Sequence, residues 1–327
     1  MRNVTVVVPA YRCSETIGVT LESILNQTYK YFAVLVVMDG PDEMLKNLVQ
    51  EWQSKFETHE REFVLEILPR NVGAAAARNH AARTVTTEYV AFIDSDDVWT
   101  SDYLEKQVRN LMSAREKDSN VVLSYSSGIA FQEDRVIRFL FSAPKVSWPD
   151  VVWKNGVGSP SGVIISRSIY EAGVYHDEAF GPLEDWEWYC RVLAYGKSIA
   201  NPDALYFYRI HANSTSSKHG YSHFVCAFML MRKNADRVGF AEAMEILALV
   251  GATCYSRTAN KMGLLFVILG CIFGVSKKRN IMRTLGNMLP SIASIFYARR
   301  LREGLSKLEN KSTIPVFLNK SIQKYIN

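Results

Sequence analysis

Three aspartates follow a short apolar run in the segment Phe92-Ile93-Asp94-Ser95-Asp96-Asp97. Carboxylates this close together repel one another, and a divalent cation relieves the repulsion. Mg²⁺ and Mn²⁺ take oxygen ligands, commonly one or two carboxylates together with the phosphates of a substrate. The spacing therefore indicates a cation site for a phosphate-bearing ligand. The alternative is a solvated turn in which Asp97 or Ser101 caps the following helix.

A second group of residues could contact the same ligand. The segment Arg70-Asn71-Val72-Gly73 precedes an alanine-rich stretch that contains Arg78. Gly73 permits close approach to the backbone, and the Arg78 guanidinium can pair with a phosphate or with an acid. The glycine spacing of a dinucleotide-binding turn is absent. The alternative is a tightly packed alanine helix with an arginine on its surface.

Alternating strand and helix signals must position these residues. Apolar runs predict strands at Val4–Val8, Phe32–Val37, Phe63–Leu68, Tyr89–Ile93 and Val121–Tyr125. Helical patterns lie between them, at about Ser14–Gln27, up to Phe56, at Ala74–Ala82 and at Ser101–Arg115. The sequence from Ala130 to Phe207 is less regular, with strands near Val136–Phe141 and Ser161–Ser166 and a helix over Asp185–Ala194. This alternation predicts an α/β fold with a mostly parallel sheet flanked by helices.

The carboxyl ends of parallel strands meet at one edge of a sheet, where ligands bind. Four predicted strands end at polar or small residues, namely Pro9-Ala10-Tyr11, Asp39-Gly40, Arg70-Asn71 and Asp94-Ser95-Asp96-Asp97. We therefore expect these four segments to line one crevice.

Taken together, several motifs resemble glycosyltransferase family 2, in its bacterial polysaccharide-synthesising form. They are Val6–Tyr11, Leu25–Tyr29, Asn71-Val72-Gly73 with Ala77-Arg78-Asn79, and Phe92–Asp97 with Trp99. Their order and spacing are intact over roughly residues 3–215. The resemblance implies a GT-A (Rossmann-like) fold, a nucleotide-diphosphate sugar donor, a divalent metal (Mn²⁺ or Mg²⁺) and inversion at the anomeric carbon.

The resemblance also assigns a donor site. It implies that Pro9, Ala10 and Tyr11 line the nucleoside pocket and that Asp39 contacts the base, for which the imide N–H of uracil is a suitable donor. The family usually has two acids here and a serine after the glycine, whereas this chain has Met38 and Pro41. The remaining residues implied to bind the donor are Gly73, Arg78, Asp94, Ser95 and Asp96, with Asp96 the direct metal ligand and Asp94 beside it.

The segment Glu184-Asp185-Trp186-Glu187-Trp188 resembles the motif that supplies the catalytic base. Inverting transfer needs one carboxylate to take the proton from the acceptor hydroxyl. The resemblance implies Asp185 for this role, with Glu184 second, and Trp186 and Trp188 as walls of the acceptor site. The alternative is an acidic helix start that favours its own dipole.

The motif Tyr208-Arg209-Ile210-His211 resembles the segment that closes many such catalytic domains. It implies that Arg209 and His211 contact the diphosphate when the polar loop Ala212–Gly220 folds over the donor, with His211 as a further metal ligand. The alternative is a structural histidine at the end of a strand.

The predicted division is a catalytic domain at 1–220, with a nucleotide-sugar half over about 1–100 and an acceptor half over about 101–220, and a helical extension at 221–327. Nine basic and two acidic residues lie between Ser276 and Lys311. The apolar stretch Met262–Val275 precedes them and is too short to span a bilayer. Apolar segments beside basic clusters suit an anionic membrane surface. The alternative is a helical subdomain packed on the catalytic domain, or a dimer contact.

The composition is that of a globular protein, with 48% hydrophobic and 22% charged residues, which excludes a disordered or collagen-like chain. The five scattered cysteines and the lack of a signal-like start indicate a reducing compartment. We therefore expect a cytoplasmic enzyme, peripheral at the inner face of the membrane, that moves a sugar onto a glycan or lipid-linked glycan and binds no nucleic acid. The alternatives are a sugar-phosphate nucleotidyltransferase and a non-catalytic carbohydrate-binding protein.

Overall fold

A computed structural model describes residues 3–148, 150–211, 225–226, 229–230 and 232–234 of the chain. The predicted loop Ala212–Gly220, the apolar stretch Met262–Val275 and the basic tail lie outside the described residues, as does nearly all of the predicted extension.

Four parallel strands form the first half of the sheet, in the spatial order β3-β2-β1-β4. They are β1 (Val4–Ala10), β2 (Phe32–Met38), β3 (Glu62–Ile67) and β4 (Tyr89–Phe92). Strands β1 and β2 are buried along their whole length, which explains their continuous apolar sequence. Since Ala10 pairs with Met38, and Met38 with Ile67, these strands end at the same edge.

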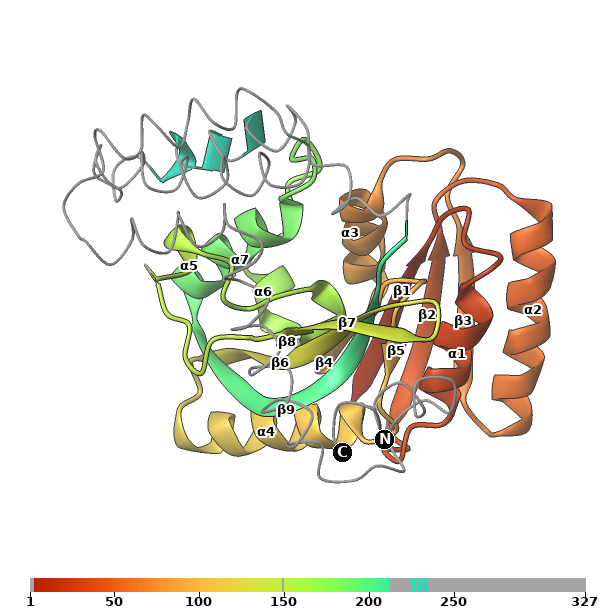
Figure 1. Cartoon of the computed structure of the whole chain (residues 1–327), viewed down its shortest axis with the longest axis horizontal. Coiled ribbons are helices and arrows are strands. Elements are labelled where there is room, and N and C mark those ends of the chain that lie inside the picture. The colour runs from red at the N-terminus through yellow and green to blue at the C-terminus, as the bar shows by residue number, and fades with distance from the viewer. Residues whose placement is uncertain (1–2, 149, 212–224, 227–228, 231, 235–327) are drawn as a thin grey trace.

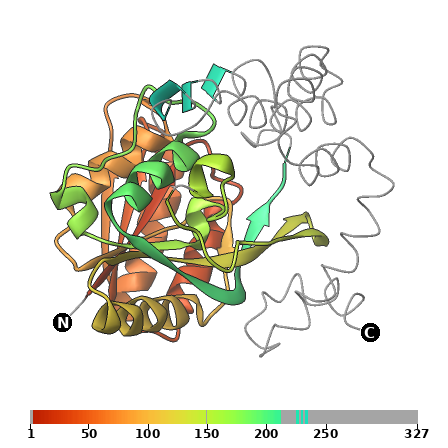
Figure 2. The ribbon, with the colours of Figure 1, turned by 90° about the vertical axis from the view of Figure 1, so that its left-hand side faces the viewer.

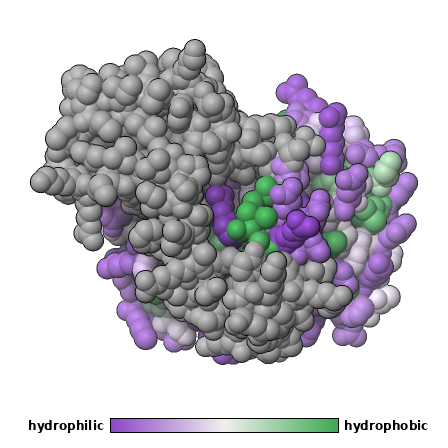
Figure 3. Space-filling view, in the orientation of Figure 1, coloured by the Kyte–Doolittle hydropathy of each residue, from purple (hydrophilic) through white to green (hydrophobic). Residues whose placement is uncertain are grey.

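Helices cover both faces of this half (Figure 1). Alternate residues of β1 point to opposite sides, so that Val6 and Val8 pack with α1 (Ile17–Leu25), α2 (Glu43–Thr58) and α4 (Tyr103–Lys117). Val7 faces the other side, which α3 (Ala74–Thr84) covers. The outer side of α2 is mainly hydrophilic (Figure 3), as expected for a helix that buries only one face.

The second half of the sheet is mixed. Beyond β4 it continues in the order β8-β6-β9-β5, with β7 paired to β6. These strands are β5 (Val98–Trp99), β6 (Val121–Gln132), β7 (Arg135–Leu140), β8 (Val163–Ser166) and β9 (Lys197–Arg209). Only β6 and β9 run parallel to each other, and β9 sweeps across the domain as one long curved strand (Figures 1 and 2).

The predicted α/β fold with helices flanking the sheet is confirmed, and its parallel part is the half that the alternation identified. The prediction of irregular sequence up to Phe207 missed β9, whose residues at 198–200 are only partly buried and whose register with β6 shifts. Strand β6 also continues to Gln132, beyond the predicted Tyr125. Helix α1 is shorter than predicted at both ends.

Short helices complete the second half: α5 (Asp150–Trp153), the 3-10 helix η1 (Pro160–Gly162), α6 (Ser168–Glu171) and α7 (Glu184–Tyr195). Residues 225–226, 229–230 and 232–233 are also helical, and Cys226 and Leu230 are buried in the same core as α7. This part of the predicted extension therefore packs on the catalytic domain. Among the described helices, none combines the length and apolar character needed to cross a membrane.

Candidate active site

The turn after β2 is built around the Asp39 carboxylate. Its Oδ1 accepts a hydrogen bond from Val72 N (2.6 Å), and its Oδ2 accepts from Gly73 N and Asn71 Nδ2 (both 2.8 Å). A carboxylate oxygen can accept two bonds, so Oδ1 keeps one lone pair. The positive φ of Gly40 (109°), and the 3.0 Å that would separate a Cβ there from Asn71 N, explain the glycine.

Asp96 lies beside His211 at the end of β9. The Asp96 Oδ2 to His211 Nε2 distance is 2.8 Å, and both side chains are partly exposed. Burial first, and then the charge of Asp94, raise the pKa of Asp96. Burial followed by the charge of Asp96 raises the pKa of Asp97 well above its usual range. The three acids therefore lie in an electrostatic environment that a cation would relieve.

Arg78 joins two candidate acids, Asp94 at 16 positions and Glu184 at 106 positions from it along the chain. It is 3% exposed, with Nη2 at 2.6 Å from Asp94 Oδ1 and Nη1 at 3.3 Å from Glu184 Oε1. Burial would lower the pKa of Arg78, but Asp94 and Glu184 outweigh that effect and raise it. Of the two predicted partners, a phosphate or an acid, the structure shows acids, and the alternative of an arginine on the surface of an alanine helix is wrong.

Helix α7 presents Glu184 and Asp185 in its first turn. Asp185 Oδ1 accepts from Trp186 N (2.7 Å), and Oδ2 accepts from Asn155 Nδ2 (3.3 Å). Burial, reinforced by the neighbouring Glu184 carboxylate, raises the pKa of Asp185 to about 7. A carboxylate that titrates near neutral pH is suited to general base catalysis.

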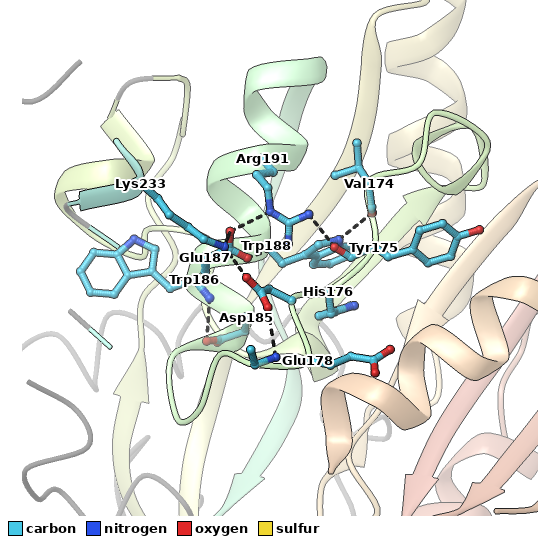
Figure 4. A network of polar contacts seen from close by, with 12 residues as sticks. Val174, Tyr175, His176, Glu178, Asp185, Trp186, Glu187, Trp188, Arg191 and Lys233 are labelled. Carbon is cyan, nitrogen blue, oxygen red and sulfur yellow. Dashed lines mark hydrogen bonds and ion pairs between the residues drawn. The ribbon is translucent and has the colours of Figure 1, made fainter. Parts of the chain in front are cut away.

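A buried ion-pair network anchors the next turn of α7 (Figure 4). Glu187 is 2% exposed and accepts from Arg191 Nε (2.7 Å), Arg191 Nη2 (2.6 Å) and Lys233 Nζ (3.0 Å). Lys233 also pairs with Asp177. Three hydrogen bonds compensate the burial of the Glu187 charge, and Lys233 links the helical segment after β9 to α7.

The two tryptophans of α7 belong to the core. Trp186 and Trp188 are 7% and 1% exposed. Their indole N–H groups donate to Val151 O (2.6 Å) and Val174 O (3.1 Å), and Trp188 stacks on His176 with 4.1 Å between ring centroids. The prediction that these rings wall an acceptor sugar is wrong, because neither offers an open face for a sugar to stack on.

The other predicted site residues are placed as follows. Pro9 and Ala10 are buried within β1, whereas Tyr11 is 47% exposed, so Tyr11 is the exposed residue of these three. Ser95 O accepts from Thr16 Oγ1 (3.0 Å). Arg209 Nε donates to Asp96 O (2.9 Å), which holds it against the acid loop. Their roles in donor binding stay predictions.

Ser161 and Asn155 were not identified from the sequence, and Asp97 was identified only as one of three acids or as a helix cap. Asp97 is fully buried, and its Oδ1 accepts from Arg209 N (2.9 Å) and its Oδ2 from Ser161 Oγ (2.6 Å). It caps no helix, because α4 begins at Tyr103 after Asp102. Ser161 and Asn155 come from the loop before β8. The run Gly158-Ser159-Pro160-Ser161-Gly162 is a turn signal, but nothing in it indicates contact with acids from β4 and α7.

The structure thus has a parallel half-sheet covered by helices, an acid loop at its carboxyl edge, and a buried Arg78 that joins this loop to Glu184 of α7. The chain belongs to glycosyltransferase family 2: the family described as "Glycosyl transferase family 2" matches residues 5–173. It is therefore a glycosyltransferase, and the nucleotidyltransferase and non-catalytic alternatives are set aside.

Named relatives share this assignment. The chain is 28% identical over 222 residues to the UDP-Glc:alpha-D-GlcNAc-diphosphoundecaprenol beta-1,3-glucosyltransferase WfaP of Escherichia coli, covering 66% of this chain and 81% of the relative. It is 27% identical over 223 residues to the amylovoran biosynthesis glycosyltransferase AmsE of Erwinia amylovora, covering 67% and 79%. The chain is thus similar to enzymes of bacterial polysaccharide synthesis.

Solved structures share the fold. S. aureus TarS 1-349 in complex with UDP-GlcNAc superposes with a TM-score of 0.59 at 18% identity, covering 99% of this chain and 89% of that one. The mannosyltransferase PcManGT from Pyrobaculum calidifontis, in complex with GDP-Man and Mn²⁺, superposes with a TM-score of 0.51 at 16% identity, covering 99% and 86%. The predicted GT-A fold is confirmed.

Proposed function

We propose that the protein transfers a sugar, with inversion, from a UDP-sugar to a hydroxyl of a glycan or lipid-linked glycan in surface polysaccharide synthesis, with a divalent cation at Asp96. The observation that carries the proposal is the Arg78 bridge. A single buried guanidinium holds Asp94 of the donor side and Glu184 of the base helix together. This bridge supports a single active site that contains both the acid loop and the proposed base.

The Asp39 turn supports a uracil nucleotide. Its carboxylate is fixed by three hydrogen bonds and keeps one lone pair on Oδ1, which an imide N–H of uracil could occupy. The exposed Tyr11 ring lies at the end of the neighbouring strand β1. The relative WfaP is named for UDP-Glc and TarS was solved with UDP-GlcNAc, which favours UDP over other nucleotides.

The potential ligand atoms of Asp96 and His211 fit a divalent cation such as Mn²⁺ or Mg²⁺. Asp96 Oδ2 and His211 Nε2 lie 2.8 Å apart, a separation suited to neighbouring ligands of one ion. Within the described residues, no three His, Cys, Asp or Glu side chains converge on one point. A cation held by one or two protein ligands and completed by substrate phosphates is a common arrangement for Mg²⁺. When bound, the ion would stabilise the negative charge of the departing diphosphate.

The protein's own residues would carry out the proton transfer. Deprotonated Asp185 takes the proton from the acceptor hydroxyl as that oxygen attacks the anomeric carbon. The bond from this carbon to the diphosphate oxygen breaks at the same time, and UDP leaves with the bonding electrons. Asn155 orients one oxygen of Asp185, and Glu184 remains engaged with Arg78.

A panel of nucleotide sugars tests the proposal. We expect UDP-sugars to raise the melting temperature in the presence of Mn²⁺ or Mg²⁺ and to do so much less with EDTA, because ligands that bind only the native state stabilise it. The stabilising donor is then incubated with diphosphoundecaprenol-linked glycans, and UDP release and product are measured. Equal stabilisation by GDP-sugars, or stabilisation insensitive to EDTA, would contradict the nucleotide or the metal assignment respectively.

A further inference from the structure

The loop from Asn155 to Gly162, which we call the coupling loop, contacts acids from both halves of the site. Near its end, the fully buried Ser161 donates its hydroxyl proton to Asp97 Oδ2 (2.6 Å) and accepts from Asp94 N (3.0 Å). Both bonds of this hydroxyl are therefore committed to the acid loop that follows β4.

The start of the coupling loop contacts the proposed base. Asn155 Nδ2 donates to Asp185 Oδ2 (3.3 Å) and to Gly158 O (3.2 Å), while Asn155 Oδ1 accepts from Gly158 N (2.9 Å). The two bonds to Gly158 fix the amide orientation, so that an N–H group, rather than the carbonyl oxygen, faces the carboxylate.

Packing holds the coupling loop rigidly on the sheet. Trp99 Nε1 donates to Ser161 O (2.7 Å), and Gln107 Nε2 donates to Gly162 O (2.8 Å). The ring of Tyr206 lies directly against Gly162, where a Cβ would be 2.6 Å from the ring atom Cε1. Because the coupling loop is bonded to β5 and α4 through Ser161 and Gly162 and to Asp185 through Asn155, it can set the distance between the acid loop and Asp185.

The Ser161 end acts on the cation site through Asp97. Asp97 also accepts from Arg209 N (2.9 Å), and Arg209 Nε donates to Asp96 O (2.9 Å). These bonds bring the end of β9 to the acid loop, where His211 lies beside Asp96. Removing the Ser161 hydroxyl would leave Asp97 with one of its two side-chain bonds and loosen this arrangement.

We propose that Ser161 and Asn155 are positioning residues: Ser161 holds Asp96 and His211 in place for the cation and diphosphate, and Asn155 orients the carboxylate of Asp185 toward the acceptor. The coupling loop thereby fixes the geometry between donor and base. This inference rests on the proposed function, because it takes Asp96 as metal ligand and Asp185 as base.

The role of Ser161 is tested by Ser161→Ala, with Ser166→Ala as the matched control. Ser166 is also buried, at 3% exposed, and its hydroxyl shares a hydrogen bond with Ser168 Oγ (2.9 Å). We expect Ser161→Ala to weaken binding of Mn²⁺ with UDP, measured by calorimetry without turnover, by about tenfold, and Ser166→Ala to leave it unchanged. Ser161→Cys, which keeps a weak donor, should fall between alanine and wild type and serves if Ser161→Ala does not fold. Wild-type Mn²⁺ affinity in both Ser161 variants would overturn this arm.

The Asn155 arm is tested by the pH profile of kcat in Asn155→Ala. Loss of a donor to the carboxylate disfavours its charged form, so we expect the acid limb to move to higher pH while UDP affinity stays unchanged. Groups that face Asp185 and remain in place are Glu184, Arg78, Asp94, Tyr189, Cys190 and Tyr206. Asn201→Ala, which removes a side-chain amide of β9 whose oxygen accepts a hydrogen bond from Asp203 N, is the control. An unmoved acid limb in Asn155→Ala would overturn this arm.

Three variants distinguish a failure of the proposed function from a failure of the coupling-loop inference. If Asp96→Ala keeps wild-type turnover, the proposed function fails. If Asp96→Ala is inactive while Ser161→Ala and Asn155→Ala match the wild type in both measurements, only the coupling-loop inference fails.

Discussion

The two halves of the sheet hold their functional groups in different ways. In the parallel half, Asp39 is fixed by the backbone of a neighbouring strand end, two of its three bonds coming from Val72 and Gly73. In the mixed half, Asp185 depends on side chains and loops, through Asn155 and the anchored α7. The candidate group of the parallel half is therefore held largely by backbone at a strand end, whereas that of the mixed half is held in part by side-chain and loop contacts.

Side-chain contacts can change without altering the sheet, whereas contacts made by the backbone at strand ends are fixed by the strand order. Arg78 is one of the direct contacts between the halves, since it pairs with Asp94 and with Glu184.

The strongest way to break the donor half is Asp96→Ala. We expect sugar transfer to fall by roughly a thousandfold or more, because the charge of the departing diphosphate loses several kcal/mol of stabilisation. UDP release in the presence of Mn²⁺ is the measurement, and circular dichroism checks the fold. Asp118→Ala, which removes an aspartate paired with Lys197 far from the site, should retain full activity. Unchanged turnover in Asp96→Ala would remove the metal assignment.

The bond between the halves is broken by Arg78→Met. Two partly buried carboxylates would lose their shared cation, and we expect the free energy of unfolding to fall by about 3 kcal/mol, as measured by urea denaturation. Arg109→Met is the control, because Arg109 is 74% exposed and pairs with Glu105 within one helix. Its effect should stay below about 0.5 kcal/mol. Equal effects of the two variants would mean that Arg78 does not join the halves.

The acceptor half is isolated by Asp185→Asn. We expect UDP binding to stay at the wild-type level while transfer falls by roughly a hundredfold, the usual contribution of a general base. Calorimetry and product formation above pH 8 report the two quantities. Glu184→Gln should reduce transfer less, since Glu184 is engaged with Arg78. Transfer that survives in Asp185→Asn would assign the base to another residue.

The smallest expected effect is on the pH dependence of stability, which reports the environment of Asp185 in the mixed half. Because the pKa of Asp185 is raised to about 7 in the folded state, the native protein binds more protons than the unfolded chain between about pH 4 and 7. This contribution stabilises the fold at low pH and is lost as pH rises through 7. Asp185→Asn lacks it, so its melting temperature relative to wild type should increase by a few degrees from pH 5 to pH 8. A constant difference would mean that the pKa of Asp185 is not raised.

The sequence predicted the donor half well for a physical reason. Buried parallel strands require continuous apolar runs, and their ends require polar residues, so Asp39, Asp94 and Asp96 could be assigned to one edge. The Asp39 turn confirms that the ends of β2 and β3 meet.

The acceptor half could be predicted only in part. The helix bearing Glu184 and Asp185 was found, but Trp186 and Trp188 were assigned outward although both are buried. Acids in the first turn of a helix can be recognised from the sequence, since they favour the helix dipole. Whether Trp186 and Trp188 are buried depends on which elements pack around α7. Ser161, Asn155 and the buried hydrogen bonds of Asp97 were missed because the partners lie 30 to 112 positions away in the chain, and no local pattern encodes such contacts.

The most direct test of the account is a crystal structure with UDP and Mn²⁺, in which anomalous scattering locates the ion. We predict one Mn²⁺ in contact with Asp96 and the diphosphate, with the uracil at Asp39. We also predict that the Asp185 carboxylate lies where the acceptor hydroxyl would approach the sugar. An ion bound away from Asp96, or a diphosphate away from the acid loop, would contradict the account.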